Sequence, residues 1–415
     1  MLKKRNFFSL SNIIIIVVIS ALITFYIFIA LQIGLKDNKL SCFFKGTDFK
    51  LLYNDAIQIK NNEIDKLYDL SFYKDFLEKN KFQLVYKPLY PPVLYYFYVP
   101  FSLLPYNWSI FLTTLVFIIL YLLSVIFLIL TFKRLYKHAL LIVLFALIFP
   151  PFFFVILNGH PSVLWIFFLS LAFYLAKKDR PFFAGLVLSF FLLKPNLFIL
   201  MFLILLFSFR YQVFSGLLLG SIFLFLISGV FNSFVLWGKW LNIVNYILSD
   251  VFHKDTLILF GEGSKRTFFY PMVSGSTVIS IIEYVFIIIG MFAIIFPIIY
   301  SYKYKNTFSR NTYWFIFPIS MVLSSPYLFN FDLIILLLPI IIFFNLMLAD
   351  RVLTKFIILM IAVVTLGIIF CFIISLYFHL QLFAVLLWFF LINGSLGKRI
   401  RNFTPKTFIE YWNNY

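Results

Sequence analysis

The chain has 415 residues, of which 63% are hydrophobic and 12% charged, and its mean hydropathy is +1.02. A soluble globular domain is about 45–50% apolar and about 25% charged. The composition therefore excludes a soluble enzyme, a disordered protein and a nucleic-acid-binding module. It indicates an all-α protein whose helices cross a membrane several times.

Apolar runs long enough for a membrane-spanning helix recur along the chain. Such a helix needs about 20 apolar residues, and we expect about twelve spans. The first run follows three basic residues and is interpreted as an anchor, because it is too long for the apolar part of a signal peptide and no cleavage site follows it. The spans are predicted at 11–33, 107–132, 138–157, 161–176, 181–193, 196–209, 212–232, 274–301, 313–325, 332–348, 356–377 and 380–397.

The net charge of +18 is concentrated on one side of the predicted spans. Lysines and arginines gather at both termini and in alternate connections, at 133–137, 177–180, 303–310 and 351–355. Cytoplasmic connections carry such an excess, so both termini are predicted to be cytoplasmic. The positive charge needs no nucleic-acid partner. Most acidic residues lie on the opposite side, so chemistry with carboxylates would face outward.

Two connections on the outer side are long, at 34–106 and 233–273. Long loops in compact proteins are often functional. The segment 49–60 has helical spacing with one apolar face and is predicted to lie along the membrane surface. Residues 65–79 are a candidate for a second short helix of this kind.

The chain shows no internal repeat, so we expect one membrane-embedded domain over 1–415, with a cytoplasmic tail at 398–415. Its two cysteines, Cys42 and Cys371, are predicted to lie at different depths, and a disulfide between them is not expected. No cluster of metal-ligand residues is visible, and no metal or other cofactor is predicted.

Two predicted hairpins are too short to cross the bilayer. The run 181–193 has 13 residues, about 20 Å at 1.5 Å per residue, and 313–325 is equally short, whereas the hydrocarbon core is about 30 Å thick. Their turns, at 193–196 and 325–332, should lie below the outer surface, where non-helical backbone must be buried in protein or line a wet cavity. A charged residue in such a turn is a candidate functional residue.

Lys194 is the charged residue of the first turn, and Pro195 places it at the start of a helix. Lysines at helix ends commonly extend to the membrane surface. A buried cation beside a helix N-terminus is, however, also suited to an anion such as a phosphate. Asp332, in the second turn, is interpreted either as a structural partner of Lys194 or as a substrate ligand.

Three further outer segments have a structural and a functional interpretation. Asp48 either caps the helix that begins there or is a functional carboxylate. Tyr90, before Pro91 and Pro92, either precedes a helix start set by proline or contacts substrate. His160 lies in a tight turn, where a lone histidine is more often a turn residue than a catalyst. These residues do not by themselves choose between an enzyme and a transporter.

Several of these segments form an ordered set. In chain order they are Thr47-Asp48-Phe49, Leu67-Tyr68-Asp69, Tyr90-Pro91-Pro92, Asn158-Gly159-His160-Pro161, Arg180-Pro181 with Ala184-Gly185, Leu193-Lys194-Pro195-Asn196, and Ser325-Pro326 through Asp332 to Pro339. The set resembles glycosyltransferase family 87, membrane enzymes of the GT-C fold that include mycobacterial polyprenol-phosphate-mannose-dependent α-mannosyltransferases. His160 and Asn196 each stand where the family has Gln, Asn330 where it has Asp, and Phe331 where it has Tyr.

The resemblance implies a GT-C-type helical bundle and a polyprenyl-phosphate-linked sugar donor taken from the outer leaflet. It also implies that an aspartate of the first outer loop acts as general base, and Asp48 is the matching position. Lys194, with Lys265 and Arg266 from the second long loop, would stabilise the donor phosphate. The predicted substrate contacts are Tyr53, Tyr90, His160, Asn196, Tyr327, Asn330 and Asp332.

The reaction expected on this basis is the inverting, metal-independent transfer of mannose, or another hexose or pentose, to a hydroxyl of a lipid or glycan. The protein is expected to act as a monomer among membrane lipids. One alternative is a transporter or flippase for a lipid-linked substrate; inverted repeats would favour it, and none is visible. Another is a scaffold without a site, against which the two truncated hairpins with polar turns argue.

Overall fold

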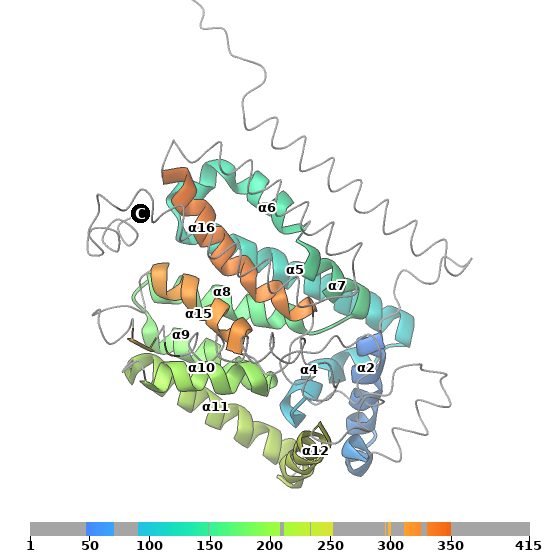
Figure 1. Cartoon of the computed structure of the whole chain (residues 1–415). Helices are drawn as coiled ribbons and strands as arrows, with labels where there is room; N and C mark the ends of the chain where they lie inside the picture. Colours follow the sequence, from blue (N-terminus) through green and yellow to red (C-terminus); the bar gives the residue numbers. More distant parts are fainter. Residues whose placement is uncertain are drawn as a thin grey trace, which may run out of the picture.

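The computed structural model describes residues 47–69, 90–147, 149–207, 211–232, 234–251, 295, 298–299, 311–324 and 330–349. Every described element is a helix, and this part of the chain contains no strand, so the all-α prediction is confirmed for it (Figure 1). The α-helices are α2 (Thr47–Lys60), α4 (Pro92–Ser102), α5 (Tyr106–Thr131), α6 (Ala139–Leu147), α7 (Pro150–Asn158), α8 (Ser162–Lys177), α9 (Pro181–Leu188), α10 (Pro195–Phe207), α11 (Tyr211–Asn232), α12 (Val235–Val251), α15 (Asn311–Ser324) and α16 (Leu337–Ala349). The 3₁₀ helices are η2 (Ile64–Tyr68), η3 (Lys133–His138), η4 (Ser189–Leu193) and η7 (Asn330–Leu336).

Two helices of the described part, α5 and Tyr211–Val230 within α11, are long and apolar enough to cross a membrane. Both expose large apolar side chains along much of their length, as a lipid-facing helix does and a soluble protein rarely does. Shorter apolar helices, among them α8 and α10, lie between them in sequence. The predicted spans at 11–33, 356–377 and 380–397, and nearly all of 274–301, lie outside the described residues, so the number of spans stays a prediction.

The predicted bounds of the long apolar runs agree with α5, α8 and α11 to within one residue. One prediction is wrong: the run 138–157 is not a single helix but two, α6 and α7. Pro150 lacks a main-chain N–H, which weakens a helix that would run through it, and it is suited to the first position of a new one. The chain therefore breaks at Phe149 and restarts there.

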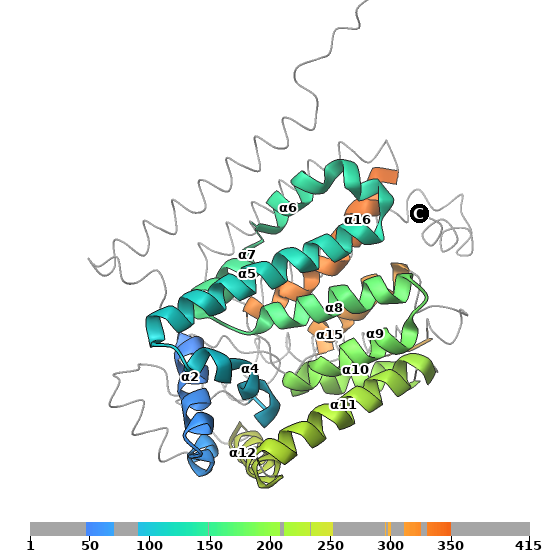
Figure 2. The same ribbon diagram turned by 180° about the vertical axis from the view of Figure 1, so that it is seen from behind.

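The helices form a bundle in which α5 packs on α8, α8 on α9, and α9 on α11. These helices run side by side in both views, whereas α2 and α4 lie together at one end of the bundle, near α12 (Figures 1 and 2). The predicted helix at 49–60 corresponds to α2, which packs against α4 and buries Phe49, Leu52 and Ala56. Its position relative to the membrane surface stays a prediction. Within 65–79, the described residues contribute only the end of η2.

Glycines allow α9 and α11 to approach backbone to backbone. A Cβ added at Gly185 would lie 2.0 Å from the carbonyl oxygen of Val213, and one added at Gly216 would lie 2.1 Å from that of Phe182. Small residues at helix contacts are typical of membrane proteins, where close backbone packing holds helices together. The Ala184-Gly185 pair therefore has a packing role in this fold.

Candidate functional site

Five separate parts of the chain meet around the buried side chain of Lys194. They are the first turn of α2, the residues before α4, the turn between α7 and α8, the turn between η4 and α10, and η7. Each contributes one residue singled out in the sequence, and all five side chains are buried: Asp48, Tyr90, His160, Lys194 and Asp332.

Lys194 ends in a buried ion pair. Its carbonyl oxygen accepts hydrogen bonds from the main-chain N–H groups of Leu197 and Phe198, at 3.1 and 3.0 Å, which fixes the residue at the start of α10. Its Nζ donates to Oδ1 of Asp332, and the two side chains are 3% and 0% exposed. The lysine therefore does not extend to the protein surface, and Asp332 is its ion-pair partner. Removing one member of such a pair leaves a buried charge and destabilises a protein by about 3–5 kcal/mol.

Ser162 links this ion pair to His160. Its Oγ donates to Oδ1 of Asp332 at 2.8 Å and lies 2.7 Å from Nδ1 of His160. The turn that carries both residues is set locally. Gly159 ends α7 in the left-handed conformation, with φ of 63°, and the His160 N–H donates to the carbonyl of Val155 at 3.0 Å, an arrangement common at helix C-termini.

Tyr90 continues the hydrogen-bonded network on the other side of His160. Its hydroxyl pairs with Nε2 of His160, and its carbonyl accepts a hydrogen bond of 2.9 Å from the Tyr68 hydroxyl. Burial, together with the nearby Asp55 carboxylate, raises the pKa of Tyr68 well above its ordinary value, so this side chain remains a proton donor. The segments around Tyr68 and Tyr90, which are distant in sequence, are thereby joined.

Phe331 contacts two residues of the site, the ring of His160 and the ammonium of Lys194. Its ring stacks on His160 with centroids 3.5 Å apart and planes inclined by 27°. The Lys194 ammonium lies 5.9 Å from the same ring centroid, within the range of a cation–π contact. Ser162 and Phe331 were not among the predicted site residues. Their only sequence signal is that they lie beside His160 and Asp332.

Asp48 lies in the first turn of α2, where a carboxylate interacts favourably with the helix dipole. Its side chain is 6% exposed and close enough to Lys194 and Tyr98 to interact with both electrostatically. The next residue fixes this position: a Cβ added at Gly159 would lie 2.5 Å from Cβ of Phe49. The start of α2 is therefore held against the turn that carries His160.

The other predicted site residues are placed differently. The Tyr53 hydroxyl donates to the carbonyl of Leu104 at 2.7 Å, and its ring packs edge-on against Tyr106. Asn196 lies in the first turn of α10 and is half-buried, and Asn330 is the first residue of η7. The remaining three lie outside the described residues: Lys265, Arg266 and Tyr327.

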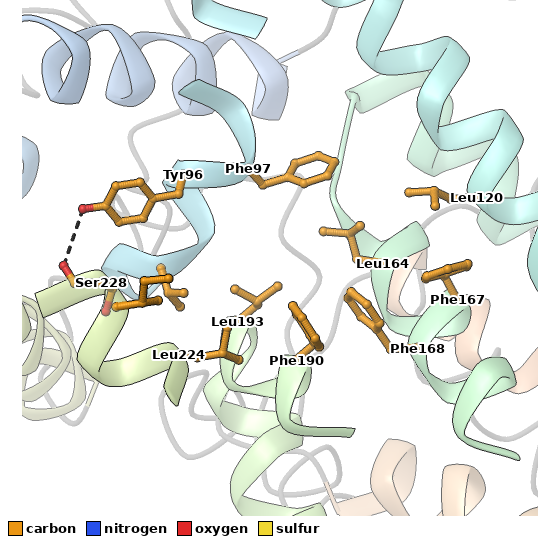
Figure 3. A pocket seen from close by; sticks show the side chains of 12 residues that line it. Tyr96, Phe97, Leu120, Leu164, Phe167, Phe168, Phe190, Leu193, Leu224 and Ser228 are labelled. Carbon is orange, nitrogen blue, oxygen red and sulfur yellow. Dashed lines mark hydrogen bonds between the residues drawn. The ribbon is translucent and has the colours of Figure 1, made fainter. Parts of the chain in front are cut away.

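An apolar cavity of about 430 Å³ lies between α4, α5, α8, η4 and α11 (Figure 3). Its wall includes Leu193, the residue before Lys194, so the cavity adjoins the polar site along the chain. Phe97 and Leu164 line it from the other side. Its polar margin is at Ser228, whose carbonyl lies 3.5 Å from the Tyr96 hydroxyl.

The described residues contain no group of three or more His, Cys, Asp or Glu side chains that could hold a metal ion together. Metal independence itself stays a prediction, because it concerns the reaction rather than the residues at rest.

Comparisons with known proteins identify the family of the chain. Searches of curated proteins and of solved structures found no similar protein. The model of glycosyltransferase family 87 matches residues 89–326, which include Tyr90, His160 and Lys194. The match covers more than half of the chain and agrees with the apolar helices of the fold. The chain belongs to glycosyltransferase family 87 and is a membrane protein that transfers a sugar.

Proposed function

We propose that the protein transfers a sugar from a polyprenyl-phosphate donor to a hydroxyl of a lipid or glycan on the outer face of the bacterial plasma membrane, inverting the anomeric carbon. The observation that carries this proposal is the position of Lys194. A buried ammonium beside a carboxylate at a helix start, next to an apolar cavity, is suited to a ligand that has both a phosphate and a long apolar chain.

The ion pair with Asp332 leaves Lys194 able to bind phosphate. An ammonium has three protons to donate, and the pair with Asp332 uses one of them. Asp332 also holds the flexible side chain in one place, so that binding the donor requires less ordering. Lys265 and Arg266 would add positive charge from the second long loop.

The apolar cavity supports a lipid-linked donor over a soluble sugar nucleotide. Leu193, the residue before Lys194 in the chain, forms part of its wall, which is almost entirely hydrocarbon. Apolar surface favours a prenyl chain by about 25 cal/mol for each Å² removed from water. The first isoprene units of the donor would lie in this cavity while the phosphate binds the ammonium.

Asp48 would act as general base. As the acceptor oxygen attacks the anomeric carbon, its proton moves to the Asp48 carboxylate and the bond from that carbon to the phosphate oxygen breaks. The electron pair stays on the phosphate, which gains charge and is stabilised electrostatically by Lys194. A base positioned in this way contributes about 10²–10⁴-fold in rate. Predicted contacts to the sugar and acceptor are Tyr53, Tyr90, His160, Asn196, Tyr327, Asn330 and Asp332.

The test uses the purified protein in lipid nanodiscs with polyprenyl phosphates that carry radiolabelled mannose, glucose or a pentose. Lipids extracted from a deletion strain serve as the acceptor pool. We expect label from one donor to appear in a new glycolipid, with release of free polyprenyl phosphate and with full activity after treatment with EDTA.

A parallel experiment with the same labelled donors and the protein in sealed lipid vesicles identifies the alternative. A transporter or flippase would move the labelled donor between leaflets of a vesicle without releasing polyprenyl phosphate. Movement of intact donor with no new glycolipid, for all three sugars, would contradict the proposed transfer.

A further inference from the structure

We propose that Ser162 is a positioning residue of the transfer reaction, joining Tyr90, His160 and the Asp332–Lys194 pair into one hydrogen-bonded unit. This proposal rests on the proposed function and extends it to a residue that contributes no charge. Ser162 is fully buried at the first position of α8, and its Oγ lies between two partners from different parts of the fold.

The donors and acceptors of this unit can be assigned in order. A carboxylate only accepts, so the single proton of the Ser162 hydroxyl is donated to Asp332. The same oxygen can then only accept from His160, so Nδ1 of the ring carries the proton. In a neutral ring Nε2 is the acceptor, and the Tyr90 hydroxyl donates to it.

One hydrogen bond is inconsistent with a protonated Nδ1, and it is weaker than the two hydrogen bonds of Ser162 Oγ. The main-chain N–H of Ser162 faces Nδ1 at 3.2 Å, whereas the side-chain bonds on either side of Oγ are 2.7 and 2.8 Å long. The bond to Asp332 is assisted by charge and about twice as strong as a neutral bond. It therefore determines which way the proton of Ser162 points, and with it the tautomer of His160.

This arrangement of donors and acceptors lets Ser162 affect the reaction in two ways. Asp332 Oδ1 is held from two directions, by Ser162 and by Lys194, so the ammonium is fixed where the donor phosphate would arrive. The tautomer of His160 directs the Tyr90 proton towards Nε2 of the ring, which fixes the orientation of the Tyr90 hydroxyl. Loss of the Ser162 hydroxyl removes one of the two contacts that hold Asp332 Oδ1, and with it the bond that sets the His160 tautomer.

The chain offers a matched control for this hydroxyl. Ser170 lies on the same helix, is fully buried, and its Oγ has no hydrogen-bond partner among the described residues. Ser170→Ala and Ser162→Ala remove the same atoms from the same helix. They differ in the partners of the lost hydroxyl and in their place along α8, since Ser162 begins the helix and Ser170 lies in its interior.

The test measures kcat and donor KM for sugar transfer, and thermal unfolding, for both variants. Ser162→Ala is expected to lower kcat by about 10- to 100-fold, the equivalent of one hydrogen bond to a charged group, with donor KM changed by less than about threefold. Ser170→Ala should match the wild type, and Ser162→Thr, which keeps the hydroxyl, should recover most of the loss. If Ser162→Ala does not fold, Ser162→Cys, similar in size but a weak donor, takes its place.

A double-mutant cycle with Asp332→Asn shows whether Ser162 acts through Asp332. Residues in one network are not additive, so the double variant should lose no more kcat than Asp332→Asn alone, and the same coupling should appear in the unfolding temperatures. Wild-type kcat in Ser162→Ala, or losses that multiply in the double variant, would overturn the positioning role. Absence of transfer by the wild type would instead refute the proposed function, while the unfolding cycle would still test the Ser162–Asp332 link.

Discussion

At the scale of single residues, Lys194 and Asp332 have to be changed together. Lys194→Met alone leaves a buried, unpaired carboxylate and is expected to lower stability by about 3–5 kcal/mol. The double variant Lys194→Met with Asp332→Leu removes both charges and should regain most of this stability, because apolar replacements of a buried ion pair are often neutral.

The double variant should nevertheless fail to transfer sugar, since the phosphate has lost its cation. Chemical unfolding followed by tryptophan fluorescence, and transfer from the labelled donor, check the two parts separately. If the stable double variant turned over donor at the wild-type rate, Lys194 would be a structural residue with no part in phosphate binding.

The sequence could indicate several of the polar residues that gather in this site but not how they are joined. Lys194 and Asp332 were identifiable because charges are rare in short apolar hairpins. Their direct pairing was only one of two open interpretations, and they are 138 positions apart. Ser162 had no such signal: a serine at a helix start usually serves that helix, whereas this one bonds to a carboxylate 170 positions away.

At the scale of elements, the contact between α9 and α11 depends on glycine. Gly185→Ala would place a methyl group 2.0 Å from the Val213 carbonyl, so the helices would have to separate. We expect a loss of about 1–3 kcal/mol, typical of overpacking. Gly238→Ala in α12 is the control, because an added Cβ there meets nothing within 4 Å, and alanine favours a helix over glycine by about 0.8–1 kcal/mol.

Thermal unfolding of the two purified variants checks this difference. The unfolding temperature of Gly185→Ala should fall below that of the wild type, and that of Gly238→Ala should stay equal or rise. Equal unfolding temperatures for the two variants would show that α9 and α11 are not packed as closely as described.

The apolar cavity gives a prediction for α11. Leu224 lines the cavity, whereas Leu218 on the same helix is exposed. Leu224→Trp should fill part of the 430 Å³ and raise the donor KM several-fold, with a smaller effect on kcat, because it removes binding common to ground and transition states. Steady-state transfer at varied donor concentration measures this effect, and Leu218→Trp is the control. A normal donor KM in a folded Leu224→Trp protein would place the prenyl chain elsewhere.

Helix bounds were predictable where proline or basic residues flank a long apolar run, as they do around α5, α8 and α11. The prediction failed at 138–157 because hydropathy is continuous across Pro150, whereas the missing N–H of proline divides the run into two helices. The closeness of α9 and α11 was also not predictable, since the glycines acquire a partner only when the chain folds back.

At the scale of the whole molecule, orientation can be tested at exposed turns. The lysine and arginine pattern predicts that the turn before α5 faces outward and the turn between α8 and α9 faces the cytoplasm. Asn107 and Asp179 are exposed in or beside these turns. In a variant without Cys42 and Cys371, an impermeant maleimide should label Asn107→Cys in intact cells and label Asp179→Cys only after lysis. Labelling of Asp179→Cys in intact cells would reverse the proposed orientation and place the site in the cytoplasm.

The family match and the fold are complementary at this scale. The family model matches residues 89–326, a range that includes neither Asp48 nor Asp332. Packing brings both to Lys194: Asp332 through the ion pair, and Asp48 through the contact between Phe49 and Gly159. In the folded chain Asp48 lies close enough to Lys194 to interact with it electrostatically.

The most direct test of the proposed reaction compares wild-type protein with Asp48→Asn in nanodiscs, following donor binding and sugar transfer in the same preparation. Asp48 lies in the first turn of α2, where a carboxylate contributes only about 0.3–1 kcal/mol through the helix dipole, so α2 should still form and the donor should bind with an affinity within a few-fold of the wild type. Transfer should fall by about 10²–10⁴-fold, because no base remains to take the acceptor proton. Near-normal transfer by Asp48→Asn would contradict the assignment of Asp48 as the base and leave Asp55 or Asp332 to be tested in its place.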